Sequence, residues 1–214
     1  MTALGAGLGL MAVSAVGFAP DRVSGLCGAA LTSSLALLSF AWAMAAAIAV
    51  GNPLPRAALF QINPAPRPLP HWALALAVAG TLALSHLLGL IVSATDNRAD
   101  SAIVRVNALL ADASGGALLA AVVALAIAPA LSEEILFRGL LLGRFCDRLG
   151  TAGGLALSSL LFGVIHLDLA QGAAALVLGL YLGALTLRTG SVHAAILCHG
   201  ANNLIAVSAG RWIN

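Results

Sequence analysis

The only glutamates of this 214-residue chain, Glu133 and Glu134, are adjacent and follow a long apolar run, in the segment PALSEEILFRG. An ionisable side chain at membrane depth costs about 2.5–3.5 kcal/mol even on lenient insertion scales, so it is usually compensated or functional. Arg138 lies four residues after Glu134 on the same helix face, in the favourable order for an ion pair. Glu133 points about 100° away. This unpaired carboxylate is therefore a candidate general base or acid.

Two further polar pairs interrupt apolar segments later in the chain. Phe162 and His166 are four residues apart in LLFGVIHLD, and His199 and Asn203 are four apart in ILCHGANN. Each pair shares a helix face, and with Glu133 they come from three segments that could converge in one bundle. A glutamate and a histidine can polarise water, and a histidine and an asparagine can donate hydrogen bonds to an oxyanion. The set fits peptide hydrolysis. The alternatives are acids that mark a helix end and histidines that pack in a core.

The composition places these residues in a membrane protein. Hydrophobic residues make up 61% of the chain and charged residues only 8%, against about 25% charged in soluble domains. The ten basic residues are all arginine and the net charge is +2, so nothing indicates a nucleic-acid partner. We expect a multi-pass protein in the lipid bilayer. The alanine-rich, lysine-free composition suggests a GC-rich bacterium, hence the inner membrane.

The apolar runs predict an all-α, polytopic transmembrane helix bundle of about seven spans, with the catalytic core in the later helices. A helix needs about 20 apolar residues to cross the hydrocarbon. Three runs are close to or above this length and contain no charge, and four are shorter or interrupted. The predicted spans are Thr2 to Ala19, Ser24 to Val50, Trp72 to Ala94, Ala117 to Leu131, Gly153 to Ile165, Gly172 to Leu187 and Val192 to Ala209.

Proline and charge divide the chain into three predicted regions. Residues 1–55 hold N-terminal transmembrane helices, 56–112 a proline-rich loop, the third span and an interfacial segment, and 113–214 the catalytic helical core. The stretch Asn52 to Pro70 contains six prolines and cannot be helical throughout. Ser101 to Asp112 is either a short helix in the interface or an ordinary loop.

Several conspicuous residues are assigned to packing. Gly179 and Gly183 form a GxxxG spacing, for which internal helix packing is favoured over dimerisation. The three cysteines, Cys27, Cys146 and Cys198, have no metal-ligand spacing. We interpret them as small packing residues.

Taken in order, the three polar motifs resemble those of the CPBP family of intramembrane proteases. EExxxR runs from Glu133 to Arg138, FxxxH from Phe162 to His166, and HxxxN from His199 to Asn203. That family includes type II CAAX prenyl endopeptidases and bacterial proteins linked with bacteriocin processing and self-immunity. The resemblance covers roughly Ala117 to Ala209. One departure is His193, where the family is expected often to have tryptophan.

The resemblance implies a catalytic set and a supporting set of residues. The catalytic residues would be Glu133, His166, His199 and Asn203, and the supporting residues Glu134, Arg138 and Phe162. The first two catalytic residues would activate a water molecule, and the last two would stabilise the oxyanion. Similarity to glutamate-dependent members favours a metal-free, glutamic-type mechanism without a cofactor. The alternative is zinc bound by Glu133, His166 and His199, although no HExxH motif is present.

The predicted function is thus intramembrane hydrolysis of a peptide bond in a membrane-anchored protein or peptide. One alternative is a CPBP-like protein that acts in bacteriocin self-immunity or trims C-terminal sorting tails. Another is a transporter or inactive homologue whose ionisable residues relay protons, although no internal repeat supports a transporter. Prenylated CAAX proteins are not expected clients in a bacterium, so the CAAX name expresses kinship.

Overall fold

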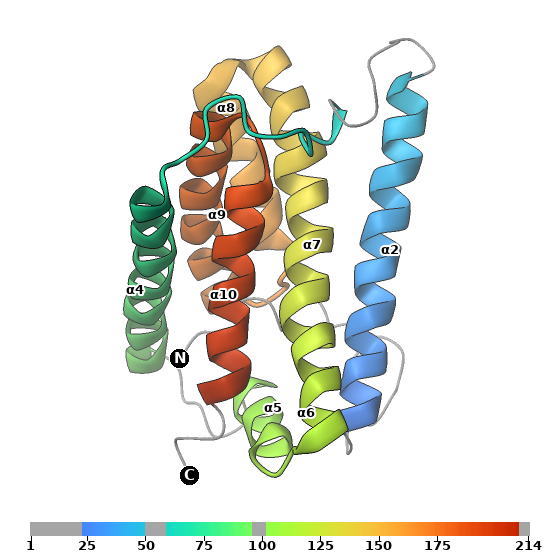
Figure 1. Ribbon diagram of the computed structural model, residues 1–214, viewed down its shortest axis with the longest axis vertical. Coiled ribbons are helices and arrows are strands. Elements are labelled where there is room, and N and C mark those ends of the chain that lie inside the picture. Colours follow the sequence, from blue (N-terminus) through green and yellow to red (C-terminus); the bar gives the residue numbers. More distant parts are fainter. Residues whose placement is uncertain (1–22, 50–58, 96–101, 210–214) are drawn as a thin grey trace.

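The computed structural model describes residues 23–49, 59–95 and 102–209, and this part of the chain forms helices and no strand. Figure 1 shows the helices gathered into one elongated bundle. The main helices outside the central stretch are α2 (Val23–Ala49), α4 (His71–Thr95), α9 (Leu169–Thr189) and α10 (His193–Ala209). The all-α class predicted from the sequence is confirmed for the described residues.

Four helical stretches of the described chain are long and apolar enough to cross a membrane. They are Val23–Ala49, His71–Val92, Gly115–Val164 and Leu169–Thr189. The predicted first span, Thr2 to Ala19, lies outside the described residues. Helix α10 has 17 residues, which is at the lower end of the length that a bilayer requires. The integral membrane character is supported, whereas the count of about seven spans is not confirmed.

The stretch Gly115–Val164 combines two predicted spans, Ala117 to Leu131 and Gly153 to Ile165, and the polar segment between them is also helical. It comprises α6 (Gly115–Val122), the π-helical segment η2 (Val123–Ile127), α7 (Ala128–Glu134), the π-helical segment η3 (Ile135–Leu141) and α8 (Leu142–Val164). The chain turns back within α8 at Gly150, whose φ of 73° and ψ of 169° are accessible mainly to glycine. The EExxxR motif therefore lies within a helix.

The two π-helical segments flank α7, which carries both glutamates. Pro129 in the first turn of α7 has no N–H and would crowd the carbonyl of Leu125 in a regular helix, and η2 supplies a wider turn there. In η3, the Phe137 carbonyl accepts a hydrogen bond from Ser158 Oγ on α8 at 3.0 Å. Such π-helical turns occur often at functional sites, and η3 contains Arg138.

The apolar core ties the N-terminal helix to the helices that carry the motifs. Ala41 and Ala45 of α2 pack in one buried cluster with Leu136, Leu140 and Phe162. Since hydrophobic burial is weak between helices in lipid, these small side chains favour close approach. Regions 1–55 and 113–214 are therefore joined through a common core in the described residues.

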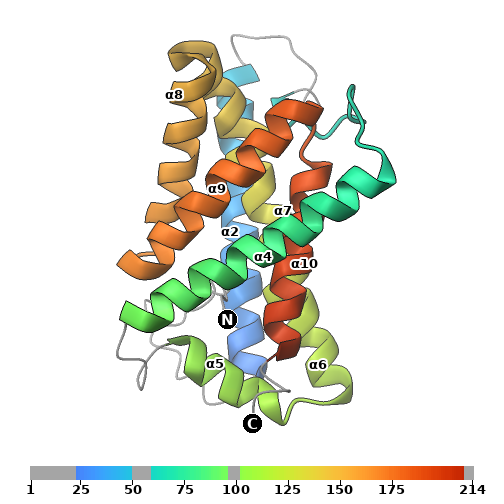
Figure 2. The same cartoon turned by 90° about the vertical axis from the view of Figure 1, so that its left-hand side faces the viewer.

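The segment Ser101 to Asp112 contains a short helix, and its place in the membrane interface stays a prediction. Helix α5 (Ala102–Ala111) lies at the end of the bundle next to α6 and the start of α2 (Figure 2). Its Val106 and Leu110 are buried in a cluster with Leu26 of α2. The helical alternative for Ser101 to Asp112 is thus confirmed.

The GxxxG glycines pack against α8, which confirms the internal role predicted for them. A Cβ atom on Gly183 would lie 2.5 Å from Leu155 Cδ1, and one on Gly179 would lie 3.2 Å from Ser159 Cα. Further along the same contact, a Cβ on Gly163 would lie 2.6 Å from the Gly172 carbonyl oxygen. Cys27 and Cys198 are buried and all three thiols are free, as expected of packing residues.

Residues 59–70, here called the strap, cross one end of the bundle over α9 and α10 (Figure 1). The strap is the described part of the proline-rich stretch. Val192 N donates to Gln61 O at 3.1 Å, Ser191 Oγ to Asn63 O at 2.9 Å, and Arg67 N to Thr189 O at 3.3 Å. These bonds fix the strap to the α9–α10 turn.

Gly139→Ala should destabilise the protein, because a Cβ atom there would lie 2.5 Å from the backbone oxygen of Phe60 in the strap. Overpacking of this kind costs about 1–3 kcal/mol. The measurement is thermal unfolding of the purified protein in detergent. The matched control is Gly116→Ala, where a Cβ meets no atom within 4 Å. Equal unfolding temperatures for both variants would show that the close contact with the strap is wrong.

Candidate active site

The two glutamates and the arginine of the EExxxR motif are buried together. Glu133, Glu134 and Arg138 have exposed fractions of 1%, 0% and 1%. Arg138 Nη1 donates to Glu134 Oε1 at 2.8 Å. The predicted ion pair is therefore confirmed, and it lies inside the protein, where a charged group needs a partner.

The same oxygen of Glu134 holds the histidine of the third motif. His199 Nδ1 donates to Glu134 Oε1 at 2.8 Å, which connects α7 to α10 across 65 residues of sequence. The spacing of the EExxxR motif pairs Glu134 only with Arg138 and does not predict this bond. Nothing in the spacing of the motifs could have revealed it, because the bond depends on how α10 packs against α7.

The Glu134 bond orients the His199 ring toward Glu133. His199 Nε2 lies 3.9 Å from Glu133 Oε2, which is too long for a hydrogen bond but suited to one bridged by water. Glu133 Oε2 is buried and has no hydrogen-bond partner among the described residues. As predicted, Glu133 is the carboxylate that Arg138 does not pair.

His166 is fixed by the backbone one turn earlier. It is fully buried, and its Nδ1 bonds the Phe162 carbonyl oxygen at 2.8 Å. Because a carbonyl oxygen only accepts, the proton in this bond is on Nδ1. A neutral His166 then has its lone pair on Nε2, the arrangement of an imidazole that accepts a proton or polarises water.

The Phe162 ring lies among the other motif residues. It meets the ring of His166 edge-on at 5.2 Å and that of His199 at 6.0 Å between centroids. The guanidinium carbon of Arg138 lies 4.1 Å from the centre of the same ring, a cation–π contact. Phe162 thus links the FxxxH motif of α8 to η3 and α10, so the three motifs converge.

Asn203 lies one turn beyond His199 on α10, as its spacing predicted. Its side chain is 2% exposed, and neither its Oδ1 nor its Nδ2 has a hydrogen-bond partner among the described residues. Buried amides of this kind are uncommon, because an unsatisfied polar group costs about 1–3 kcal/mol. The amide is therefore available to a ligand.

The buried cluster contains two acids and one arginine. A buried charge is unfavourable in a low dielectric unless it has a partner. Glu134 pairs with Arg138, whereas Glu133 Oε2 has His199 Nε2 at 3.9 Å.

The alternative zinc site does not match this arrangement. The described residues contain no group of three His, Cys, Asp or Glu side chains placed to bind one metal ion. Glu133, His166 and His199 would all need to approach a common point at about 2 Å. A metal-free mechanism stays a prediction.

The buried carboxylates lie on α7, one histidine and the amide lie on α10, and His166 lies in the turn directly after α8. A membrane-spanning helical bundle with this set of residues defines a candidate intramembrane hydrolase. Residues 115–205 match the family model described as type II CAAX prenyl endopeptidase Rce1-like. This segment contains all three motifs, and the match confirms the resemblance predicted from them over these residues. The match supports a peptidase. No curated protein and no solved structure matches the chain.

Arg138→Ala should lower stability strongly, because it leaves Glu134 buried without its guanidinium partner and removes the cation from the Phe162 ring. Breaking one side of a buried pair costs about 3–5 kcal/mol. Thermal unfolding in detergent measures the loss. The control is Arg188→Ala, which removes an exposed arginine and should change stability by less than about 1 kcal/mol. A silent Arg138→Ala would contradict the buried ion pair.

Proposed function

We propose that this protein is an intramembrane endopeptidase that hydrolyses a peptide bond in a membrane-anchored protein or peptide. The observation that carries the proposal is the double acceptor role of Glu134. Its Oε1 binds Arg138 and His199 at 2.8 Å each, and His199 is thereby held 3.9 Å from Glu133. A carboxylate free to act as a base thus faces a positioned imidazole.

The proposed reaction uses one water molecule. Glu133 takes a proton from the water, His166 polarises the same water through Nε2, and the water oxygen attacks the peptide carbonyl carbon. His199 Nε2–H and the Asn203 amide donate to the resulting oxyanion. When the tetrahedral intermediate collapses, the C–N bond breaks and the proton held by Glu133 passes to the leaving amine.

The position of the site favours a substrate that is itself in the membrane. Arg144 and Arg148 are the first basic residues after Arg138 and belong at the headgroups. Glu133 lies 11 positions before Arg144, which places it about 16 Å deeper along a helix of 1.5 Å rise. That is about half of a 30 Å hydrocarbon layer. A peptide bond must reach this depth to be cleaved.

Two observations favour the peptidase over a transporter. Arg138 is held between the Glu134 carboxylate and the Phe162 ring, which suits a fixed site better than a relay that moves. The segment 115–205 also matches a family of endopeptidases. We assign the glutamic type on the geometry of Glu133, and the substrate as a membrane-anchored polypeptide without specifying a lipid on it.

Glu133→Gln should abolish proteolysis and leave the fold intact, because the amide keeps the shape of the side chain but cannot accept a proton. Loss of a general base lowers rates by about 10²–10⁴-fold. The measurement is mass spectrometry of membrane proteins from cells that carry wild type or variant. Fragments seen only with wild type would establish cleavage and name the substrate.

The matched control for this comparison is Asp112→Asn, which alters an exposed acid outside the site. It should give the wild-type fragments. Unchanged cleavage by Glu133→Gln would reject Glu133 as the base. The absence of any wild-type-specific fragment, with both proteins folded, would reject the peptidase.

Asn203→Ala should slow cleavage of the identified substrate by about 10²–10³-fold, as expected for loss of one oxyanion donor. Its neighbour Asn202 points about 100° away on the same helix, so Asn202→Ala should retain activity. Initial cleavage rates in detergent, with unfolding temperatures measured in parallel, test this difference. If Asn202→Ala is the slower variant, the oxyanion donor has been assigned to the wrong asparagine.

A further inference from the structure

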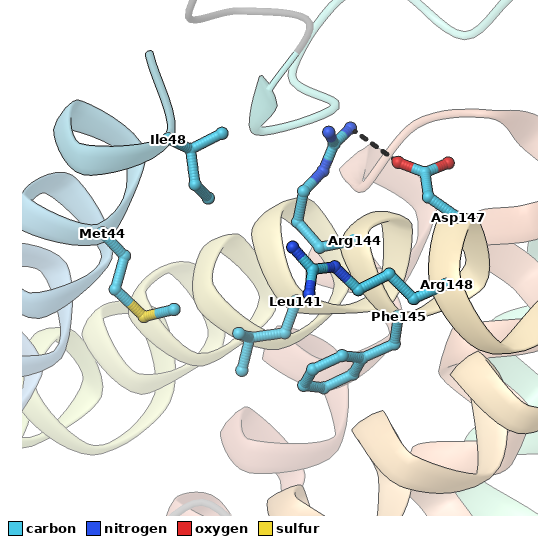
Figure 3. Close-up of a pocket in the computed structure, with 7 residues that line it drawn as sticks. All are labelled: Met44, Ile48, Leu141, Arg144, Phe145, Asp147 and Arg148. Atoms are coloured by element: carbon cyan, nitrogen blue, oxygen red, sulfur yellow. Dashed lines mark ion pairs between the residues drawn. The ribbon is translucent and has the colours of Figure 1, made fainter. Parts of the chain in front are cut away.

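A cavity of about 520 Å³ lies apart from the three motifs, between the end of α2 and the beginning of α8. This volume is within the range of ligand sites. Figure 3 shows Met44 and Ile48 of α2 on one side, facing side chains of the other helix. The lining residues are Met44, Ile48, Leu141, Arg144, Phe145, Asp147 and Arg148. We call this cavity the α2–α8 pocket.

The polar side of the α2–α8 pocket is positively charged. Its charged residues are Arg144, Arg148 and Asp147, and they sum to +1. Arg144 Nη2 binds Asp147 Oδ2 at 3.2 Å, but this pair is partly exposed, with 30% and 62% of the two side chains accessible. Arg144 Nε is buried and has no hydrogen-bond partner among the described residues. The pocket thus offers a donor and a positive charge to an anion.

The other residues that line the pocket are apolar. Met44, Ile48, Leu141 and Phe145 present only hydrocarbon, sulfur and an aromatic ring. A small hydrophilic anion would make no favourable contact with these apolar side chains. An anion that carries a hydrocarbon chain could contact both sides at once.

The pocket lies at the end of the bundle where charged residues gather. Arg144 and Arg148 are in the first part of α8, and Gln61 of the strap lies close to Gly143. The strap in turn brings Arg67 to the α9 end, where Arg67 Nη2 donates to Leu187 O at 3.4 Å. Arginines that follow long apolar helices mark the headgroup level of a bilayer.

We propose that the α2–α8 pocket binds an anionic phospholipid. The phosphate accepts hydrogen bonds from the guanidinium groups of Arg144 and Arg148, and an acyl chain lies against Met44, Ile48 and Phe145. Arginine suits phosphate because its planar fork donates two hydrogen bonds at once. Basic pockets between transmembrane helices are suited to lipid headgroups. This site is separate from the proposed peptidase centre and does not depend on it.

Native mass spectrometry of the full-length protein in detergent tests the proposal. The protein is mixed with equal amounts of phosphatidylglycerol and phosphatidylcholine that carry the same acyl chains. Wild type should retain phosphatidylglycerol in preference. The double variant Arg144→Gln/Arg148→Gln should lose about tenfold in affinity for it. The single variant Arg148→Gln changes an exposed side chain, so it should fold normally and show a smaller loss.

Arg188→Gln is the matched control, because it removes an exposed arginine from the last turn of α9 outside the pocket. It should bind phosphatidylglycerol as wild type does. Equal loss in Arg188→Gln, equal retention of the two lipids, or full displacement of the lipid by glycerol phosphate would each overturn the proposal. The last result would identify a site for free anions.

Discussion

The structure depends on one buried carboxylate oxygen. Glu134 Oε1 accepts hydrogen bonds from Arg138 and from His199. The side chains of Glu134 and Arg138 are each at most 1% exposed. Charge-assisted hydrogen bonds offset part of the cost of removing these groups from water. The first bond is local to one helix, whereas the second fixes α10 against α7. That second bond also holds His199 Nε2 at 3.9 Å from Glu133 Oε2.

Close packing is the second constraint on the site. The Arg138 guanidinium lies over the Phe162 ring, and a Cβ atom on Gly179 would lie only 3.4 Å from Arg138 Nη2. A glycine of the GxxxG motif therefore leaves room for the arginine as well as for α8. If α9 moved away from this contact, the ion pair between Arg138 and Glu134 would become exposed. Packing and electrostatics therefore depend on the same atoms.

Two parts of the long helical stretch perform different tasks in this arrangement. One part carries the buried glutamates, and the part around Arg144 lines the α2–α8 pocket and contacts the strap. Leu141 in the pocket wall is three residues from Arg138, less than one turn away. A molecule bound in the pocket would thus lie close to Arg138, which supports the candidate active site, without contacting the proposed catalytic residues.

Much of this protein could be predicted from the sequence, because local patterns fix local structure. Low charge and long apolar runs indicated helices in a membrane, and the i, i+4 spacing of Glu134 and Arg138 predicted their ion pair. The motifs also indicated the protease family. The Glu134–His199 bond and the contact of Phe162 with His199 could not be predicted. They depend on how helices far apart in the chain pack together, and spacing along one helix contains no information about the partner it meets.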